Sequence, residues 1–197
     1  MPKATTPISR SLSSALTRIL DSVTRGYTRY ATGSVQASKA LKLAQKFHDL
    51  YGIGCTPAQR ITRRQHGRAN ALLVLLWHED AERVSWCLLA TPGTGLEAEK
   101  DMKDALSEKL VFEDYQLVRR AKDGRTTWTF KRTKAAMADW VALVRDQAQK
   151  HHMGAVRDTL QRAANQPGFQ GVREQTFTLI ELARSLGFTG EAPHVYY

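Results

Sequence analysis

The chain has 197 residues, 42% hydrophobic and 24% charged, which suits one globular domain or one domain with an appendage. Its longest apolar run, Ala71 to Trp77, is far below the roughly 20 residues that cross a bilayer, so we expect a soluble protein with no membrane partner. Two distant cysteines, Cys55 and Cys87, imply neither a disulfide framework nor a zinc site, and a cytoplasmic location is expected.

The net charge of +10 is distributed unevenly along the sequence. Residues 1–69 contain 12 basic and 2 acidic side chains, whereas residues 70–133 contain 10 and 11, and residues 134–197 contain 7 and 6. An even distribution would indicate only a basic soluble protein. Concentration in the first third predicts a surface that meets a polyanion.

Helical periodicity predicts two helices in this basic third. The first is capped by Ser9 and stops at Gly26. The second is capped by Ser34 and runs to about Tyr51, with Leu41 and Leu50 among its core residues and Gly52 ending it. Residues 55–69 then read as a linker rich in Arg, Gln and Thr.

Residues 70–133 predict two hairpins around a helix. Apolar and alternating runs indicate strands at residues 71–77 and 84–89, and at residues 110–119 and 125–132 around an Asp123-Gly124 turn. Thr94 and Glu97 fit a capping box that would start a helix over residues 96–107.

Three further helices are predicted at residues 134–151, 155–165 and 172–186, separated by Gly and Pro. The fold class is therefore α+β: a mainly antiparallel four-stranded sheet (ββαββ) flanked by N-terminal and C-terminal helices. We divide the chain into a basic helical region with its linker, residues 1–69, and an α+β core with a C-terminal helical layer, residues 70–197. The two parts could also form one compact domain.

The candidate nucleic-acid contacts are basic side chains, because Arg can donate two hydrogen bonds to one phosphate and Lys adds a point charge. They are Arg25, Arg29, Lys39, Lys42, Lys46, Arg60, Arg63, Arg64, Arg68, Arg119, Arg120 and Lys122. Tyr27 and Tyr30 are the candidates for stacking on unpaired bases, although such tyrosines are often packing residues. We expect the linker 60–68 and the turn 119–122 to share one edge of the sheet.

The residue patterns give little support for a phosphate-binding loop, a metal site or a catalytic site. The loop from Thr91 to Gly95 lacks the Lys-Ser/Thr of a P-loop, and acidic residues follow it, so a structural role is expected there. The six histidines form no His-x-His pair or H-E-x-x-H helix. We assign no catalytic residue, metal site or cofactor.

These patterns predict a nucleic-acid-binding accessory protein that contacts the DNA or RNA backbone through its basic N-terminal helical surface. Such a protein would suit a mobile genetic element. One alternative is an interaction subunit of a larger (ribo)nucleoprotein assembly, docking on a partner or a second copy through its C-terminal helices. A metal-dependent nuclease is another alternative, with Glu79, Asp80, Glu113 and Asp114 as its acids.

Overall fold

The fold is α+β, as seen in a computed structural model that describes residues 6–122 and 124–195, with only the backbone of Lys122 and Arg125 described. Chain contacts divide the protein into two compact units, Met1–Glu113 and Asp114–Tyr197. The sequence-based division at residue 69 followed charge, whereas this boundary follows packing. Each unit has a net charge of +5, from 16 basic and 11 acidic side chains in the first and from 13 and 8 in the second.

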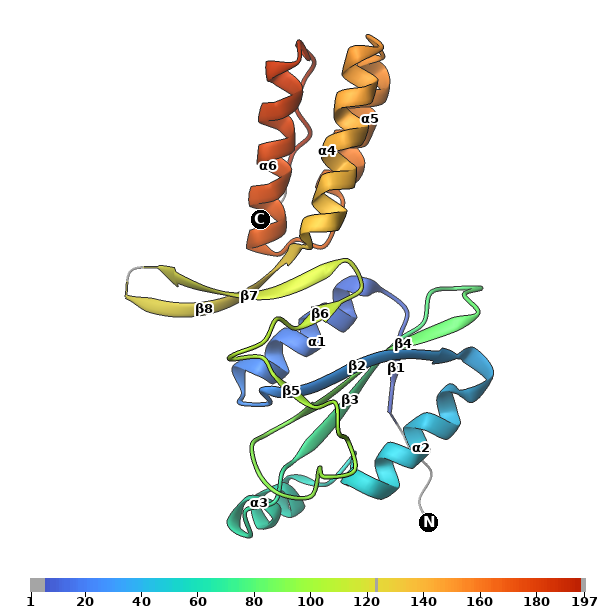
Figure 1. Cartoon of the computed structure of the whole chain (residues 1–197), viewed down its shortest axis with the longest axis vertical. Helices are drawn as coiled ribbons and strands as arrows, with labels where there is room; N and C mark the ends of the chain where they lie inside the picture. The colour runs from blue at the N-terminus through green and yellow to red at the C-terminus, as the bar shows by residue number, and fades with distance from the viewer. Residues whose placement is uncertain (1–5, 123, 196–197) are drawn as a thin grey trace. The chain divides into compact units, whose positions relative to one another are not determined.

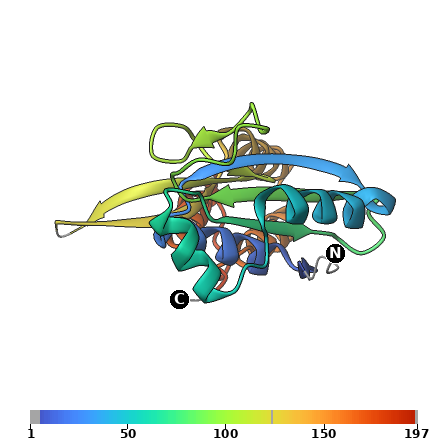
Figure 2. The same ribbon diagram turned by 90° about the horizontal axis from the view of Figure 1, so that it is seen from below.

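The first unit contains a mixed sheet with helices on both sides (Figures 1 and 2). Its described strands lie in the order β1-β3-β4-β2-β5, and only the β1–β3 pair is parallel. The strands are β1 (Ile8–Ser9), β2 (Arg29–Gln36), β3 (Ala71–Leu76), β4 (Arg83–Ala90) and β5 (Lys103–Asp104). The helices are α1 (Leu12–Thr24), η1 (Ala37–Lys39, a 3-10 turn), α2 (Ala40–Tyr51) and α3 (Pro57–Gln65).

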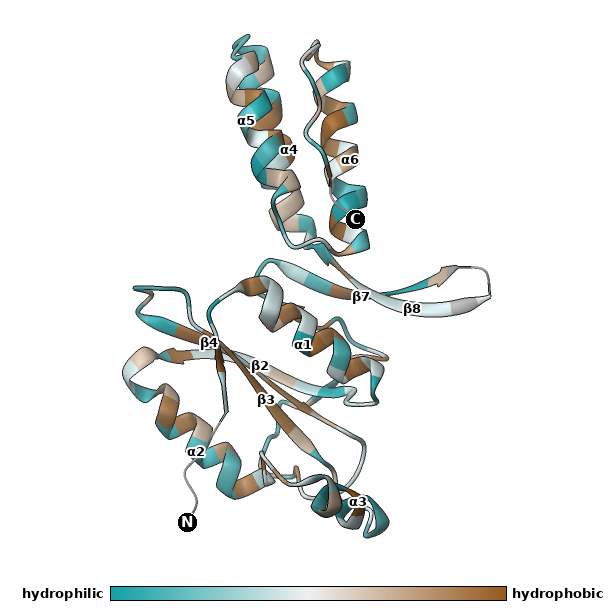
Figure 3. Ribbon diagram, turned by 180° about the vertical axis from the view of Figure 1, so that it is seen from behind, coloured by the Kyte–Doolittle hydropathy of each residue, from teal (hydrophilic) through white to brown (hydrophobic). Residues whose placement is uncertain are grey.

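Alternate residues of the two central strands cover the two faces of this sheet. Leu73 and Leu75 pack with Phe47 of α2 in one hydrophobic cluster. The intervening Val74 and Leu76 therefore face the side of α1, which contacts β3 and β4. These four side chains are at most 1% exposed, so β3 is buried on both faces, as predicted. Figure 3 colours the strand hydrophobic along its length.

The basic third contains a strand that the helical interpretation missed. Arg29–Gln36 is β2, which pairs with β4 over its whole length, so Ser34 lies in a strand and does not cap a helix. The helix begins only at Ala40, and its buried stripe follows Ala40, Ala44, Phe47 and Tyr51. Leu41 and Leu50 consequently lie outside that stripe and are 72% and 51% exposed, contrary to prediction.

Three other local predictions need correction. The first helix is capped by Ser11 because the Ser9 backbone pairs with β3. The expected linker contains α3, which Pro57 and the Thr56–Gln59 capping box initiate. Residues 96–107 form no helix: Lys103–Asp104 pairs with β2. The Glu97 carboxylate accepts the Gly95 N–H, so it does not complete a cap with Thr94.

The second unit begins with the predicted second hairpin, β7 (Tyr115–Lys122) and β8 (Arg125–Arg132), but its first strand starts at Tyr115 and not at residue 110, because residues 113 and 114 form a turn. β7 and β8 pair antiparallel in a sheet separate from that of β1 to β5, and the short strand β6 (Val111–Phe112) lies at the end of the first unit. The expectation of one four-stranded sheet was therefore wrong. The missed strand β2 lies beside β4 in the first sheet, between β4 and β5.

The three predicted C-terminal helices are confirmed as α4 (Lys134–Gln149), α5 (Met153–Ala164) and α6 (Gln170–Ser185). Val144, Leu160 and Leu179 are fully buried in a cluster that all three helices share. α6 also packs on β8, where a Cβ at Gly171 would lie 2.6 Å from the Phe130 carbonyl oxygen. The apolar stripes are thus used inside the unit.

Candidate nucleic-acid interface

Strand register brings several of the candidate arginines to one end of the first sheet. Arg29 pairs with Ala90, and Ala90 pairs with Ala71, so β2 and β3 start at the same end. Arg25 precedes β2, and α3 leads into β3 at this end (Figure 1). We call this set the basic end; its members are Arg25, Arg29, Arg60, Arg63, Arg64 and Arg68.

The helix α3 contributes three of these arginines and has an unusual composition. None of its nine residues is buried, all of them being described, and it contains no acidic side chain. Ile61 is 60% exposed. Figure 3 shows mainly hydrophilic colours along α3, in contrast to β3. Apolar burial therefore contributes little to holding this helix in place.

Hydrogen bonds, instead, attach α3 to the sheet. Arg63 donates from Nε and Nη2 to the Ala69 carbonyl oxygen, at 3.1 and 2.9 Å, and its side chain is half-buried. The Asn70 Nδ2 donates to the Arg60 carbonyl oxygen at 3.2 Å. These contacts commit Arg63 to structure and leave the exposed Arg64 and Arg68 side chains without a protein hydrogen-bond partner in the described part of the chain.

The arginines of the basic end are not neutralised by ion pairs. In the described part of the first unit, no Lys or Arg nitrogen lies within 4.0 Å of a carboxylate oxygen; the ion pairs of the described residues, such as Arg120–Glu174, belong to the second unit. Acids are nevertheless present: Asp104 lies opposite Arg29 in the β2–β5 pair. The Glu99 carboxylate is occupied by the Tyr51 hydroxyl at 2.9 Å.

The other end of the sheet has a more acidic loop. Residues 77–82 connect β3 to β4 there, and Glu79, Asp80 and Glu82 are all exposed. Lys39 and Lys42 lie near this end, because α2 begins where β2 finishes. Lys46 follows one turn further along α2. The structure therefore separates the two lysines from the arginines of the basic end.

The remaining basic candidates belong to the second unit, so the structure does not join them to the basic end. The Arg119 guanidinium lies 5.5 Å from the centre of the Trp128 ring. Arg120 pairs with Glu174 at 2.6 Å. The Lys122 side chain lies outside the described residues.

The tyrosine candidates differ in exposure. Tyr27 is half-buried between Arg25 and Arg29 in the sequence and remains a stacking candidate. Tyr30 is 3% exposed, and its hydroxyl donates to the Lys109 carbonyl oxygen at 2.8 Å. Burial raises the pKa of Tyr30 to about 12. Tyr30 is thus a packing residue with no face open to a base.

One relevant arginine was missed by sequence reasoning. Arg18 on α1 is half-buried, and burial lowers its pKa. It lines a cavity together with Arg60 of α3. Arg18 lies three residues after the buried Ala15 and four before the buried Ser22. This helical spacing could have indicated from the sequence that Arg18 borders the core face of α1.

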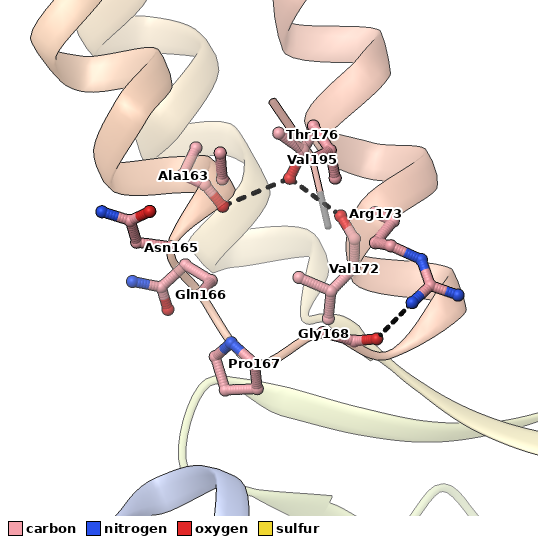
Figure 4. Close-up of a pocket in the computed structure, with 10 residues that line it drawn as sticks. Ala163, Asn165, Gln166, Pro167, Gly168, Val172, Arg173, Thr176 and Val195 are labelled. Atoms are coloured by element: carbon pink, nitrogen blue, oxygen red, sulfur yellow. Dashed lines mark hydrogen bonds between the residues drawn. The ribbon is translucent and has the colours of Figure 1, made fainter. Parts of the chain in front are cut away.

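The larger cavity, of about 410 Å³, lies in the second unit and is shown in Figure 4. Arg173 is the titratable residue among those that line it, and its Nη1 donates to the Gly168 carbonyl oxygen at 2.7 Å. Thr176 donates from its hydroxyl toward the carbonyl oxygens of Ala163 and Val172. This lining provides no group of converging acids, bases or nucleophiles.

The described residues contain no group of three or more His, Cys, Asp or Glu side chains placed to hold one metal ion. The loop from Thr91 to Gly95 does not precede a helix; the Thr91 hydroxyl oxygen accepts the Asn70 N–H at 2.9 Å, a structural role. Within the described ranges, no helix combines the length and apolar character needed to span a membrane. Comparisons of the chain with family models, curated proteins and solved structures gave no match.

Proposed function

We propose that this chain binds nucleic acid through the basic end, with exposed arginines contacting backbone phosphates. The observation that carries the proposal is α3, a helix that has no fully buried residue and contains three arginines, no acid and no ion pair. The proposed contacts are Arg25, Arg29, Arg60, Arg64 and Arg68, with Tyr27 as a stacking platform beside them.

The energetics of α3 support this interpretation. Ordering a residue costs about 1–2 kcal/mol of conformational entropy, which helices usually recover by packing an apolar face. This helix has no such face, and its arginines repel one another. A polyanion lying against it would relieve that repulsion and release counterions, which is the main source of affinity in protein–nucleic acid binding.

The two free cysteines, of which Cys87 is fully buried, fit the proposed cytoplasmic setting. An accessory role on DNA or RNA requires no catalytic set. The apolar stripes that motivated an interaction subunit are packed inside the second unit, so they no longer favour that alternative.

A salt titration tests the proposal. If each of the five arginines neutralises one phosphate, log affinity for duplex falls against log salt with a slope of about −4.5, roughly a 500-fold loss between 50 and 200 mM. Fluorescence anisotropy with single-stranded and duplex DNA and RNA measures this slope and the preferred form. A slope near zero, or no binding to any of the four, contradicts the proposal.

A further inference from the structure

A small cavity in the first unit lies at the edge of β3, beside the basic end. Its volume is about 190 Å³, and its lining includes Arg18, Ile53, Arg60, Ala71 and Leu72. The cavity therefore joins side chains of α1 and α3 to the start of β3.

The cavity exists because β1 covers only part of that edge. Ile8 and Ser9 pair with Leu75 and Leu76, at the far end of β3. Pro7, which precedes them and lines the cavity, has no N–H with which to extend the pairing. The edge beside Ala71 and Leu72 consequently faces a hollow, with no described strand paired to it there.

The two charged side chains among the described lining residues of this hollow are both positive. Arg18 and Arg60 both line it, and none of the described lining residues is acidic. Arg60 uses its Nε to donate to the Cys55 carbonyl oxygen at 3.1 Å, which orients the guanidinium and leaves its two Nη groups for a ligand. Two guanidinium groups beside one small cavity create a site that favours an anion with several acceptor oxygens.

The volume restricts what that anion can be. At about 190 Å³ the cavity is smaller than the roughly 300 Å³ at which pockets for whole small-molecule ligands begin, yet it has room for a phosphate group. A phosphomonoester has three free oxygens, a charge of about −1.5 to −2 and one ester link, so it can enter a cavity. An internal phosphodiester is held by the strand on both sides and has less charge.

We propose that this cavity binds the terminal phosphomonoester of a nucleic-acid strand, with Arg18 and Arg60 as its ligands. The proposal rests on the proposed function, because the strand that presents the phosphate would lie on the basic end. Backbone contacts alone would bind a strand equally well whatever its end group. The cavity would add a preference for strands with a phosphorylated end.

The test compares oligonucleotides of one sequence with a 5′-phosphate, a 3′-phosphate or hydroxyl ends, by fluorescence anisotropy at fixed salt. We expect the wild-type protein to bind one phosphorylated form about tenfold more tightly than the hydroxyl form. Arg18→Gln and Arg60→Gln should reduce this ratio to about one. Arg64→Gln changes the same charge on α3 outside the cavity, so it should weaken all forms and leave the ratio intact.

Equal affinities for all three ends in the wild-type protein would overturn the proposal, as would a ratio that persists in both cavity variants. Arg60 is exposed, so Arg60→Gln keeps the test valid if the half-buried Arg18→Gln fails to fold. A nucleoside 5′-monophosphate, added as competitor, should abolish the preference if the phosphomonoester is the group recognised. Its inability to do so would count against the cavity.

The salt slope of the hydroxyl form separates the two proposals. A steep slope without an end preference refutes the cavity site and leaves the proposed function standing. If no oligonucleotide binds, with or without a terminal phosphate, both proposals are overturned.

Discussion

Among the arginines of the second unit, we expect Arg132 on β8 to contribute most to stability. It is 1% exposed and donates to three groups: the Ala163 carbonyl oxygen at 2.8 Å, the Val172 carbonyl oxygen at 3.2 Å and the Thr176 hydroxyl oxygen at 3.2 Å. Its guanidinium also lies 5.6 Å from the centre of the Trp140 ring. Burial lowers the pKa of Arg132, since desolvation disfavours its charge.

Two substitutions separate packing from hydrogen bonding. Arg132→Ala removes both the volume and the donors, and we expect it to lower the free energy of unfolding by about 3 kcal/mol, within the range for large-to-small core changes. Arg132→Met keeps most of the volume and removes a desolvated charge. Its expected cost is about 1 kcal/mol, because the Ala163 carbonyl oxygen keeps the Thr176 hydroxyl and the Gln166 N–H as donors.

Urea unfolding followed by circular dichroism measures both values, and hydrogen exchange localises the loss. Protection should fall in α5 and α6 and remain unchanged in α1 and α2. Arg157→Ala is the control, since the side chain is 67% exposed and its ion pair with Asp158 should contribute less than about 0.5 kcal/mol. Equal stability of Arg132→Ala and wild type, or equal costs for Ala and Met, would refute this reasoning.

Two further predictions concern packing and alkaline pH. Gly171→Ala should lower the melting temperature, because a Cβ there would lie 2.6 Å from the Phe130 carbonyl oxygen, whereas Gly154→Ala on α5 has open space and should leave it unchanged or raise it. Tyr30 keeps its proton in the folded state up to a pKa of about 12, while the unfolded phenol ionises near its ordinary value of 10, so stability should fall as pH rises from 10 to 12. Tyr30→Phe should lose about 1 kcal/mol at pH 8 and show a shallower decline above pH 10, measured by urea unfolding; identical pH profiles would contradict this assignment.

The elements that sequence predicted well are those whose signal is local. The apolar runs of β3 and β4 and the stripes of α4 to α6 each report burial directly, although the end of β4 is buried on both faces and does not alternate. β2 was missed because its neighbours are distant: eight residues pair with β4, some 50 positions away, and Gly33 and Ser34 disguise the alternation. α3 was missed because it lacks the apolar stripe that usually identifies a helix. Its capping box at Thr56 and Gln59 was a local signal in the sequence.

For the candidate site, too, the sequence predicted the local features and not the non-local ones. That residues 1–69 are basic is a fact of composition, and it was available at once. Which basic groups share an end of the sheet depends on the register that aligns Arg29 with Ala90 and Ala71, a non-local property. Arg18 was passed over because its relation to Arg60 exists only in the folded chain.

The most direct test of the central claim compares two double variants that remove the same charge from opposite ends of one sheet. Arg64→Gln/Arg68→Gln alters the basic end, and Lys39→Gln/Lys42→Gln alters exposed side chains near the acidic loop. We predict that the arginine variant lowers the magnitude of the salt slope for duplex by about 1.8, whereas the lysine variant leaves it unchanged. Equal effects of the two variants would show that net charge alone drives binding and would contradict the assignment of the interface to the basic end.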